Sequence, residues 1–383
     1  MSIQAAAANT LTLFMCGDVM TGRGIDQILP HPSAPEIYEP YVSSAYEYVE
    51  LAERANGRID KPQSFSYIWG DILPELERHR PAIRIANLET AVTTSDEAWP
   101  GKGIHYRMHP RNVDCLTAAA LDCCVLANNH TLDWSREGLA ETLRVLREAG
   151  IKTAGAGDRL ADACEPARFK LSDRQRLLVF ACGSPDSGIG VGWEATEYRS
   201  GLWVIDDLNA CAIEQIGRRI ESERRRGDIV VMSLHWGGNW GYEVTREQQR
   251  FAHQLIDKAG IDIVHGHSSH HPRPIEVYRG KLILYGCGDL LNDYEGIGGY
   301  ERYRSELGLM YFPEIDRETH QLVRLTMSPT CIRRLRVNLA QRNDAQWLAA
   351  TLSRECAPFG TSLRLQPDGD LALKWQHDVE AIA

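Results

Sequence analysis

The chain has 383 residues, of which 43% are hydrophobic and 25% charged, and its formal net charge is −10. This composition is typical of a globular protein and excludes a disordered chain. The acidic balance argues against a nucleic-acid partner, because nucleic-acid binders carry a basic surface. The densest group of arginines, in residues 218–226, is interleaved with glutamates on a predicted helix, and we interpret it as a solvated helix face.

The N-terminal residues 1–10 carry no basic residue and no long apolar run, so we expect a disordered N-terminus and no signal peptide. No stretch approaches the roughly 18 apolar residues that a membrane helix needs. Ten scattered cysteines without a Cys-x-x-Cys pair favour buried free thiols in a reducing compartment. We therefore expect a cytoplasmic protein without a membrane anchor. The sequence leaves its oligomeric state open.

Short apolar runs rich in β-branched residues alternate with segments of helical periodicity along the chain. The predicted strands are Leu11–Cys16, Ala82–Ala86, Cys123–Ala127, Leu177–Ala181, Ile229–Ser233, Ile261–Val264 and Leu282–Tyr285. The predicted helices include Tyr67–His79, Arg111–Ala120, Arg136–Ala149, Ala212–Glu223 and Arg246–Ala259. Strands that alternate with helices predict an α/β fold.

The pattern changes near Gly308. Three segments without helices between them predict an antiparallel portion of the sheet: Gly308–Phe312, Gln321–Met327 and Cys331–Val337. A helix over Ala345–Glu355 and a hairpin around Pro367-Asp-Gly369 are expected to follow. Because no linker marks a boundary, we predict a single domain over residues 11–383, with a core over 11–312 and a C-terminal elaboration over 313–383.

Long irregular stretches separate several of these elements. They are Leu29–Tyr41, Thr93–Gly103, Pro185–Ser200 and Asn292–Ser305. Loops of this length in a compact domain often face a substrate or are mobile.

Polar side chains directly follow five of the predicted strands. The segments are Cys16-Gly-Asp18-Val-Met20, Ala86-Asn-Leu-Glu89, Ala127-Asn-Asn-His130-Thr-Leu-Asp133, Leu234-His235-Trp236 and His265-Gly-His267-Ser-Ser-His270-His271. Ligands of open α/β sheets bind beyond the carboxyl ends of the strands, so we expect these side chains to form one site. Carboxylate, amide and imidazole ligands together suit Mn²⁺, Zn²⁺ or Fe better than Ca²⁺.

Each of these residues also has a purely structural interpretation. Asp18 alone could cap a helix, Asn128 and Asn129 could belong to a turn, and His235 alone could be a hydrogen-bonded core histidine. Four histidines within residues 265–271 favour a metal site over those alternatives. The glycosylation sequon at Asn129 is rejected, because nothing in the sequence indicates secretion.

The motifs, in their order along the chain, resemble the CapA family of capsule and poly-γ-glutamate synthesis proteins, within the calcineurin-like metallophosphoesterase superfamily. The resemblance covers residues 11–312 and rests on G-D-V-M, A-N-L-E, A-N-N-H-T-L-D, H-W-G and G-H-x-x-H, with Pro274-Ile-Glu276 downstream. Each motif alone is weak, but five in order are specific. The resemblance implies a four-layer α/β/β/α sandwich with one or two divalent transition metals at the strand ends.

The resemblance also implies a set of metal ligands, namely Asp18, Glu89, Asn129, His235, His267 and His270. Asp18 and His270 would bind the first metal, Glu89 would bridge both, and the remaining three would bind the second. The superfamily has a histidine where this chain has Met20, a loss that the CapA branch shares, so the first metal is the weaker expectation.

Other matched positions imply roles in catalysis and substrate binding. His130 would be the general acid or an oxyanion contact. The residues expected to bind substrate are Arg107, Asn128, Trp236 and Asp289, which replaces the family's usual asparagine. Arg107 is chosen because guanidinium binds carboxylate and phosphate bidentately, and a surface salt bridge is its alternative.

Together these residues predict a metal-dependent hydrolase that uses a metal-activated water. Its substrate would be small and anionic or peptide-like, with a phosphoester or an amide, such as a γ-glutamyl bond, as the bond cleaved. Two alternatives remain open. One is a non-catalytic poly-γ-glutamate or capsule assembly factor, although capsule members are commonly membrane-anchored. The other is a transferase or ligase of a small-molecule pathway with the same metal site.

Overall fold

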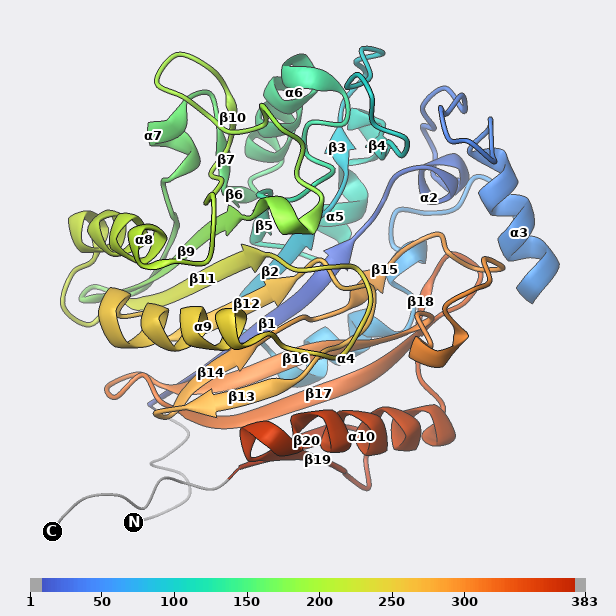
Figure 1. The fold of residues 1–383 in the computed structure, drawn as a ribbon. Helices are drawn as coiled ribbons and strands as arrows, with labels where there is room; N and C mark the ends of the chain where they lie inside the picture. The colour runs from blue at the N-terminus through green and yellow to red at the C-terminus, as the bar shows by residue number, and fades with distance from the viewer. Residues whose placement is uncertain (1–8, 376–383) are drawn as a thin grey trace, which may run out of the picture.

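Two β-sheets form the centre of the molecule in the computed structural model, which describes residues 9–375 (Figure 1). The larger sheet has the strand order β19 (Thr361–Leu365), β20 (Leu371–Trp375), β17 (Leu322–Ile332), β16 (Leu307–Asp316), β1 (Thr10–Val19), β2 (Ile83–Leu88), β5 (Cys123–Val125) and β6 (Lys152–Ala154). Within it, β15 (Asp289–Leu291) pairs with β1 and β18 (Val337–Leu339) pairs with β17. The smaller sheet has the order β13 (Ile275–Tyr278), β14 (Lys281–Leu284), β12 (Ile263–His267), β11 (Ile229–His235), β9 (Gln175–Gly183) and β8 (Ala167–Ser172).

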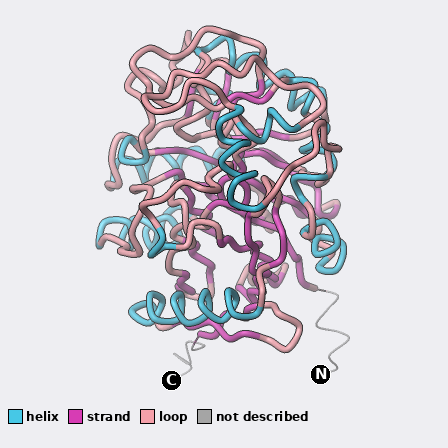
Figure 2. Tube along the Cα trace, turned by 90° about the vertical axis from the view of Figure 1, so that its right-hand side faces the viewer, coloured by secondary structure: helices cyan, strands magenta, loops and turns pink. Residues whose placement is uncertain are grey.

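Helices surround the two sheets, as Figure 2 shows. They are α2 (Gly24–Ile28), α3 (Tyr46–Asn56), α4 (Ile72–His79), α5 (Asp114–Ala118), α6 (Ser135–Glu148), α7 (Leu160–Ala163), α8 (Ala210–Glu223), α9 (Arg246–Ala259) and α10 (Arg342–Cys356). Two short pairs form separate two-stranded sheets, β3 (Ala91–Val92) with β4 (Arg107–Met108) and β7 (Ala156–Gly157) with β10 (Gly201–Leu202). None of the described helices is long and apolar enough to cross a membrane.

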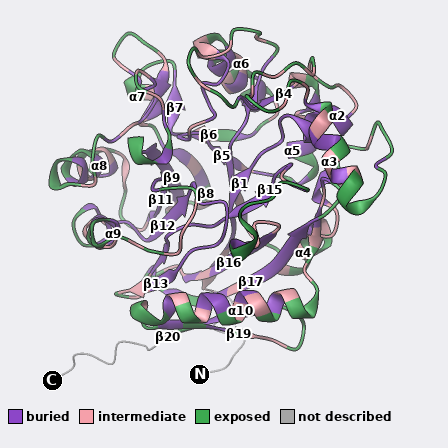
Figure 3. Ribbon diagram, turned by 45° about the vertical axis from the view of Figure 1, so that its right-hand side comes forward, coloured by how far each residue is buried: buried purple, intermediate pink, exposed green. Residues whose placement is uncertain are grey.

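The alternation of side chains along the strands creates four layers. In β1, Leu13 and Met15 face the smaller sheet, whereas Phe14 packs with residues of α3 to α6 on the outer face. In β11, Val231 belongs to the core between the sheets, and Val230 packs with α8 and α9. The buried strands at the centre and the exposed outer faces of the helices are visible in Figure 3. The predicted α/β/β/α sandwich is therefore confirmed.

The antiparallel C-terminal portion is also confirmed, since β16 pairs antiparallel with β1 and with β17. The predicted boundary at 312/313 falls inside β16. The predicted strand Cys331–Val337 is wrong. Arg334 and Leu335 have φ of 61° and 52°, which turns the chain between the end of β17 and the start of β18.

Two further differences concern the N-terminal half. The predicted helix Tyr67–His79 is divided into a 3₁₀ turn, Tyr67–Trp69, and α4. Gly70 separates them at φ 41°, where a Cβ would lie 2.4 Å from the carbonyl oxygen of Val337. Of the predicted disordered residues 1–10, residues 1–8 lie outside the described part of the chain, and β1 begins at Thr10.

The ten cysteines are all free, and eight of them are buried, as the sequence predicted. The carboxyl ends of β1, β2, β5, β11 and β12 carry the predicted site residues. A hydrogen bond of 2.9 Å from His265 Nε2 to the carbonyl oxygen of Cys16 ties β12 to β1 across the two sheets. This contact brings the strand ends of both sheets to one place.

Candidate metal centre

Asp18 lies where three strands of the larger sheet meet. It is near the end of β1, beside Asp289 of β15, in a parallel pair whose register is irregular at this point. Gly17 permits this close approach, because a Cβ there would lie only 2.0 Å from the carbonyl oxygen of Gly288. The backbone amide of Asp18 donates to that same carbonyl at 3.1 Å.

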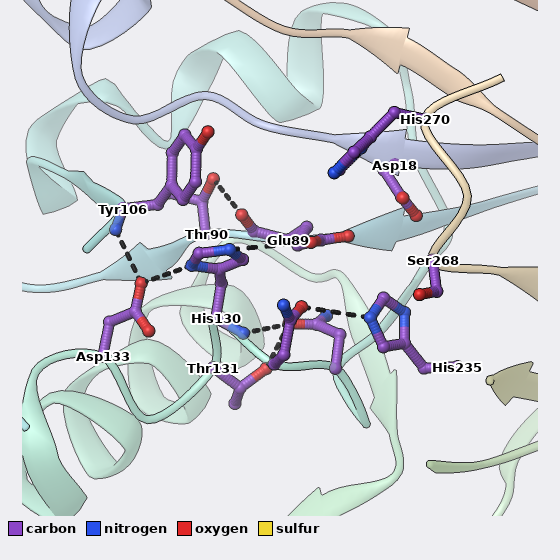
Figure 4. Close-up of polar contacts among 12 residues, drawn as sticks. Asp18, Glu89, Thr90, Tyr106, His130, Thr131, Asp133, His235, Ser268 and His270 are labelled. Atoms are coloured by element: carbon purple, nitrogen blue, oxygen red, sulfur yellow. Dashed lines mark hydrogen bonds and ion pairs between the residues drawn. The ribbon is translucent and has the colours of Figure 1, made fainter. Parts of the chain in front are cut away.

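Asp18 is shared by two groups of three metal-ligating side chains. One group is Asp18, His235 and His267, and the other is Asp18, His270 and Asp289. In each group the potential ligand atoms lie within 4.8 Å of one another, and all five residues are buried. Figure 4 shows Asp18 with His270 on one side and His235 on the other. Asp18 is thus the residue common to both groups, whereas Glu89, the bridging ligand that the resemblance implied, belongs to neither group.

The hydrogen bonds of Asp18 leave one oxygen available. Oδ1 accepts from the side-chain amide of Asn87 at 2.7 Å. Oδ2 is buried and has no hydrogen-bond partner among the described residues. A buried carboxylate oxygen without a partner is costly, and a bound cation would remove that cost.

The proton positions on three histidines follow from a chain of hydrogen bonds. His265 Nε2 donates to the carbonyl oxygen of Cys16, so its Nδ1 accepts from Ser233 Oγ at 3.1 Å. Ser233 Oγ in turn accepts from His267 Nε2 at 2.7 Å. The free lone pair of His267 is therefore on Nδ1, and Ser233 orients the ring as outer partners of metal-bound histidines do.

His235 presents a second lone pair to the same point. Its Nε2 lies 3.0 Å from Asn129 Oδ1, to which it donates, and its Nδ1 lies 2.7 Å from His267 Nδ1. Burial lowers the pKa of His235 and of His267 well below the usual value, so both rings are neutral. The lone pairs of His235 Nδ1 and His267 Nδ1 repel each other unless both bind the same cation. The donor set therefore fits a divalent transition metal.

In the centre, burial and neighbouring negative charges make the ionised forms of Asp18 and Glu89 unfavourable. Burial, and then the charge of Asp289, raise the pKa of Asp18 to about 7. Burial, and then the charge of Asp18, raise the pKa of Glu89 well above its usual range. Burial alone would lower the pKa of His270, but Asp289, 3.0 Å from its Nδ1, and Asp18 raise it overall. These pKa shifts indicate that a positive charge beside Asp18 and Asp289 would be stabilised.

Replacing Asp18 with asparagine is expected to change how the stability of the metal-free protein depends on pH. A carboxyl group with a raised folded-state pKa stabilises the fold below its unfolded pKa, and this contribution is lost as pH rises through about 7. Asparagine carries no charge at any pH. The Tm of Asp18→Asn relative to wild type should therefore rise by several degrees from pH 5 to pH 8, in thermal unfolding of chelator-treated proteins. The exposed Asp173→Asn is the control, and an unchanged or falling difference for Asp18→Asn would contradict the charge argument.

His130 faces the centre from the loop after β5. Its Nδ1 lies 2.6 Å from Asp133 Oδ2, and its Nε2 lies 3.8 Å from Glu89 Oε1. Lys102 Nζ contacts Asp133, the carbonyl oxygen of Asn129 and, at 3.1 Å, His130 Nδ1. Burial lowers the pKa of His130 to about 4, although Asp133 opposes the shift. The ring is therefore neutral, with Nδ1–H directed at Asp133 and the lone pair of Nε2 directed at the centre. Figure 4 shows the ring between Asp133 and Glu89.

Two other predicted residues, Asn128 and Asp289, contact the centre in different ways. Asn128 donates from its amide to Asn87 Oδ1 and to the carbonyl oxygen of Leu88, both at 2.9 Å. Its own oxygen accepts from the His130 amide and from Thr131 Oγ1. Every polar atom of its side chain is thus occupied, so it positions the loop. Asp289, expected to bind substrate, instead belongs to the second group of ligands.

Arg107 and Trp236 lie apart from the ligands. Arg107 Nη1 donates to Asp96 Oδ1 at 2.6 Å and to the carbonyl oxygen of Ser95. The ion pair with Asp96 is the salt bridge that was the alternative to a substrate contact for Arg107. Trp236 is buried in the core beneath α9, and its Nε1 donates to the carbonyl oxygen of Tyr285 at 3.1 Å. The structure brings neither side chain into the centre.

Three residues of the site were not singled out in the sequence. Lys102 lies in the irregular stretch 93–103, whose length was its only signal. Asp133 and Asn87 stand inside the quoted motifs, three residues after His130 and two before Glu89. Their contacts with His130 and Asp18 assign them supporting roles.

The chain is similar in sequence to several known proteins. The model of a family described as "Bacterial capsule synthesis protein PGA_cap" matches residues 12–294. A Mycobacterium tuberculosis (strain H37Rv) protein described as a probable polyglutamine synthesis accessory protein is 44% identical over 95% of this chain and 96% of its own. The PGA biosynthesis protein CapA of Bacillus subtilis is 25% identical over 81% and 69%. A crystal structure described as a novel phosphatase of Mycoplasma pneumoniae has a TM-score of 0.44 and 11% identity, covering 84% of this chain and 93% of that one.

Proposed function

Because this chain belongs to the PGA_cap family of bacterial capsule synthesis proteins, as its resemblance to CapA proteins predicted, we propose that it is a metal-dependent hydrolase in the metabolism of a capsule-type polymer or its precursors. The bond cleaved is an amide or a phosphoester of a small anionic or peptide-like substrate. The observation that carries the proposal is the buried group of Asp18, His235 and His267, whose potential ligand atoms lie within 4.8 Å of one another. His235 Nδ1 and His267 Nδ1 are 2.7 Å apart, and Asp18 Oδ2 is buried without a hydrogen-bond partner among the described residues.

The ligand positions divide between two sites. Asp18, His235 and His267, with Asn129 beside them, would hold one metal, and Asp18, His270 and Asp289 would hold the other. A divalent metal bound there supplies Lewis acidity and lowers the pKa of a water molecule. Glu89, between His130 and Asn87, remains a proposed ligand.

The chain's own contribution to the reaction centres on His130. Asp133 fixes the ring so that Nε2 presents its lone pair, and contacts with His130 and then with Lys102 lower the pKa of Asp133 in spite of burial. A neutral imidazole with this orientation accepts a proton at Nε2, or accepts a hydrogen bond from substrate. It is therefore better suited to act as a base than as the general acid that the resemblance implied.

Elemental analysis of protein purified without chelator is the first test. We expect one to two equivalents of Mn, Zn or Fe per chain. Reloading chelator-treated protein with each metal should restore cleavage of γ-glutamyl amides or phosphodiesters. Protein that carries no transition metal and gains no activity on reloading would overturn the proposal.

A second function is favoured by the M. tuberculosis relative, which is described as an accessory protein. In that case the metal fold serves as a non-catalytic scaffold or binding surface in polymer assembly. The two functions differ in their dependence on His130. Loss of the His130 imidazole would leave a scaffold intact and would disable a hydrolase.

A further inference from the structure

A cavity of about 660 Å³ lies at the carboxyl ends of β9 and β11, next to the starts of α8 and α9. Its walls come from the segments after β9 and β11 and from the starts of both helices, and include Ser184, Gly237, Leu208, Thr245 and Gln248. Gly237 is two residues beyond the proposed ligand His235. We call this space the Arg273 cavity.

Arg273 forms the buried part of the cavity wall. It is 4% exposed, and its Nε is buried without a hydrogen-bond partner among the described residues. Its Nη2 donates to the carbonyl oxygen of Glu243 and, at 3.5 Å, to Gln248 Oε1. No described carboxylate forms an ion pair with it, although buried arginines are normally paired. The absence of a side chain at Gly237 leaves Nη1 open, since a Cβ there would lie 3.3 Å from it.

The rim of the cavity carries the opposite charge. Five exposed carboxylates lie there: Asp186, Asp206, Asp207, Glu243 and Glu247. A guanidinium group binds a planar carboxylate bidentately. A phosphate dianion would gain the same contact but would be repelled by the rim. A ligand that carries both a carboxylate and an ammonium group can place the carboxylate on Arg273 and the ammonium group beside the carboxylates of the rim.

We propose that the Arg273 cavity binds a zwitterionic amino acid or short peptide, with its carboxylate on Arg273 and its ammonium group at the acidic rim. This inference rests on the proposed function in so far as the bound peptide is the substrate. Since the cavity wall continues directly from the strand that carries His235, a peptide held there lies next to the metal centre. The proposal therefore favours an amide over a phosphoester as the bond cleaved.

Calorimetric titration of chelator-treated, full-length protein tests the proposal without involving the metal. The probes are L-alanyl-L-alanine, its N-acetyl form, its C-terminal amide and inorganic phosphate. We expect the free dipeptide to bind tightest, with each blocked form at least about 10-fold weaker, because each loses one charged contact. Arg273→Gln should weaken dipeptide binding about 10- to 100-fold, and Arg273→Lys should weaken it less. The exposed Arg218→Gln is the control and should leave binding unchanged.

The double variant Asp186→Asn, Glu243→Gln keeps the test informative if the Arg273 variants misfold, because substitutions at these two exposed positions should not disturb the fold. It should weaken binding of the free dipeptide and strengthen binding of the N-acetyl form, since the rim then repels anions less. Three results would overturn the proposal: no binding of the free dipeptide to metal-free protein, phosphate binding as tightly as the dipeptide, or unchanged binding by Arg273→Gln. Dipeptide binding by protein that neither holds a metal nor hydrolyses an amide would overturn the proposed function and leave this inference intact.

Discussion

Replacing His130 with alanine is expected to lower kcat for hydrolysis about 100- to 10,000-fold while the metal content stays unchanged. His130 Nε2 lies 3.8 Å from Glu89 Oε1, but His130 belongs to neither group of three potential ligands. The variant therefore removes a proton acceptor and leaves the proposed ligands in place. Steady-state kinetics together with elemental analysis of the same preparation separates the two effects.

Asp133→Asn provides the matched comparison, because it keeps the volume of the side chain and removes the charge that holds His130 Nδ1–H. We expect it to lower kcat as well, by less than the removal of the imidazole, since the ring stays in place. Full hydrolytic activity of both variants would contradict the assignment of His130 as the proton acceptor. A parallel loss of metal in His130→Ala would instead make His130 a ligand.

The fold was largely predictable from the sequence because each central strand is a short run of apolar residues that ends in polar ones. The errors fall where tertiary contacts determine the backbone. Nothing near Arg334 and Leu335 predicts two successive left-handed residues, and the break at Gly70 depends on the distant carbonyl of Val337. The helix α3 was not predicted, because only Tyr48, Val49 and Ala52 of its eleven residues are buried.

The site was predictable to the extent that it follows strand ends. The ligands come directly after apolar runs, and parallel strands deliver them to one edge. Trp236 was assigned to the substrate, but alternation along an extended chain directs it away from its neighbour His235, into the core under α9. Lys102 and Arg273 could not be predicted, because single charged residues in irregular segments become informative only once the fold buries them.

Replacing Asp18 and His267 together with alanine is expected to abolish metal binding and, with it, hydrolysis. Asp18 is common to both groups of ligands, and His267 supplies one of the two facing lone pairs. Loss of two ligands from a three-residue site leaves too few donors to compete with water. Metal content after gel filtration measures the effect directly, and retention of metal at the wild-type level would contradict the assignment.

The third group of potential ligands in the described chain, Glu75, His79 and Asp370, supplies the control. There, Arg78 Nη2 donates to Glu75 and, at 2.7 Å, to Asp370, so a guanidinium group already occupies the place of a cation. The double variant Glu75→Ala, His79→Ala should therefore leave the metal content unchanged.

His270→Ala or Asp289→Asn should remove only the metal assigned to Asp18, His270 and Asp289, and should halve a content of two equivalents. Asp289 can supply the ligand that is missing at Met20, since it pairs with Asp18 in the sheet and contacts His270 at 3.0 Å. A wild-type content of two that falls to one in Asp289→Asn would establish that exchange of ligands, and an unchanged content would exclude it.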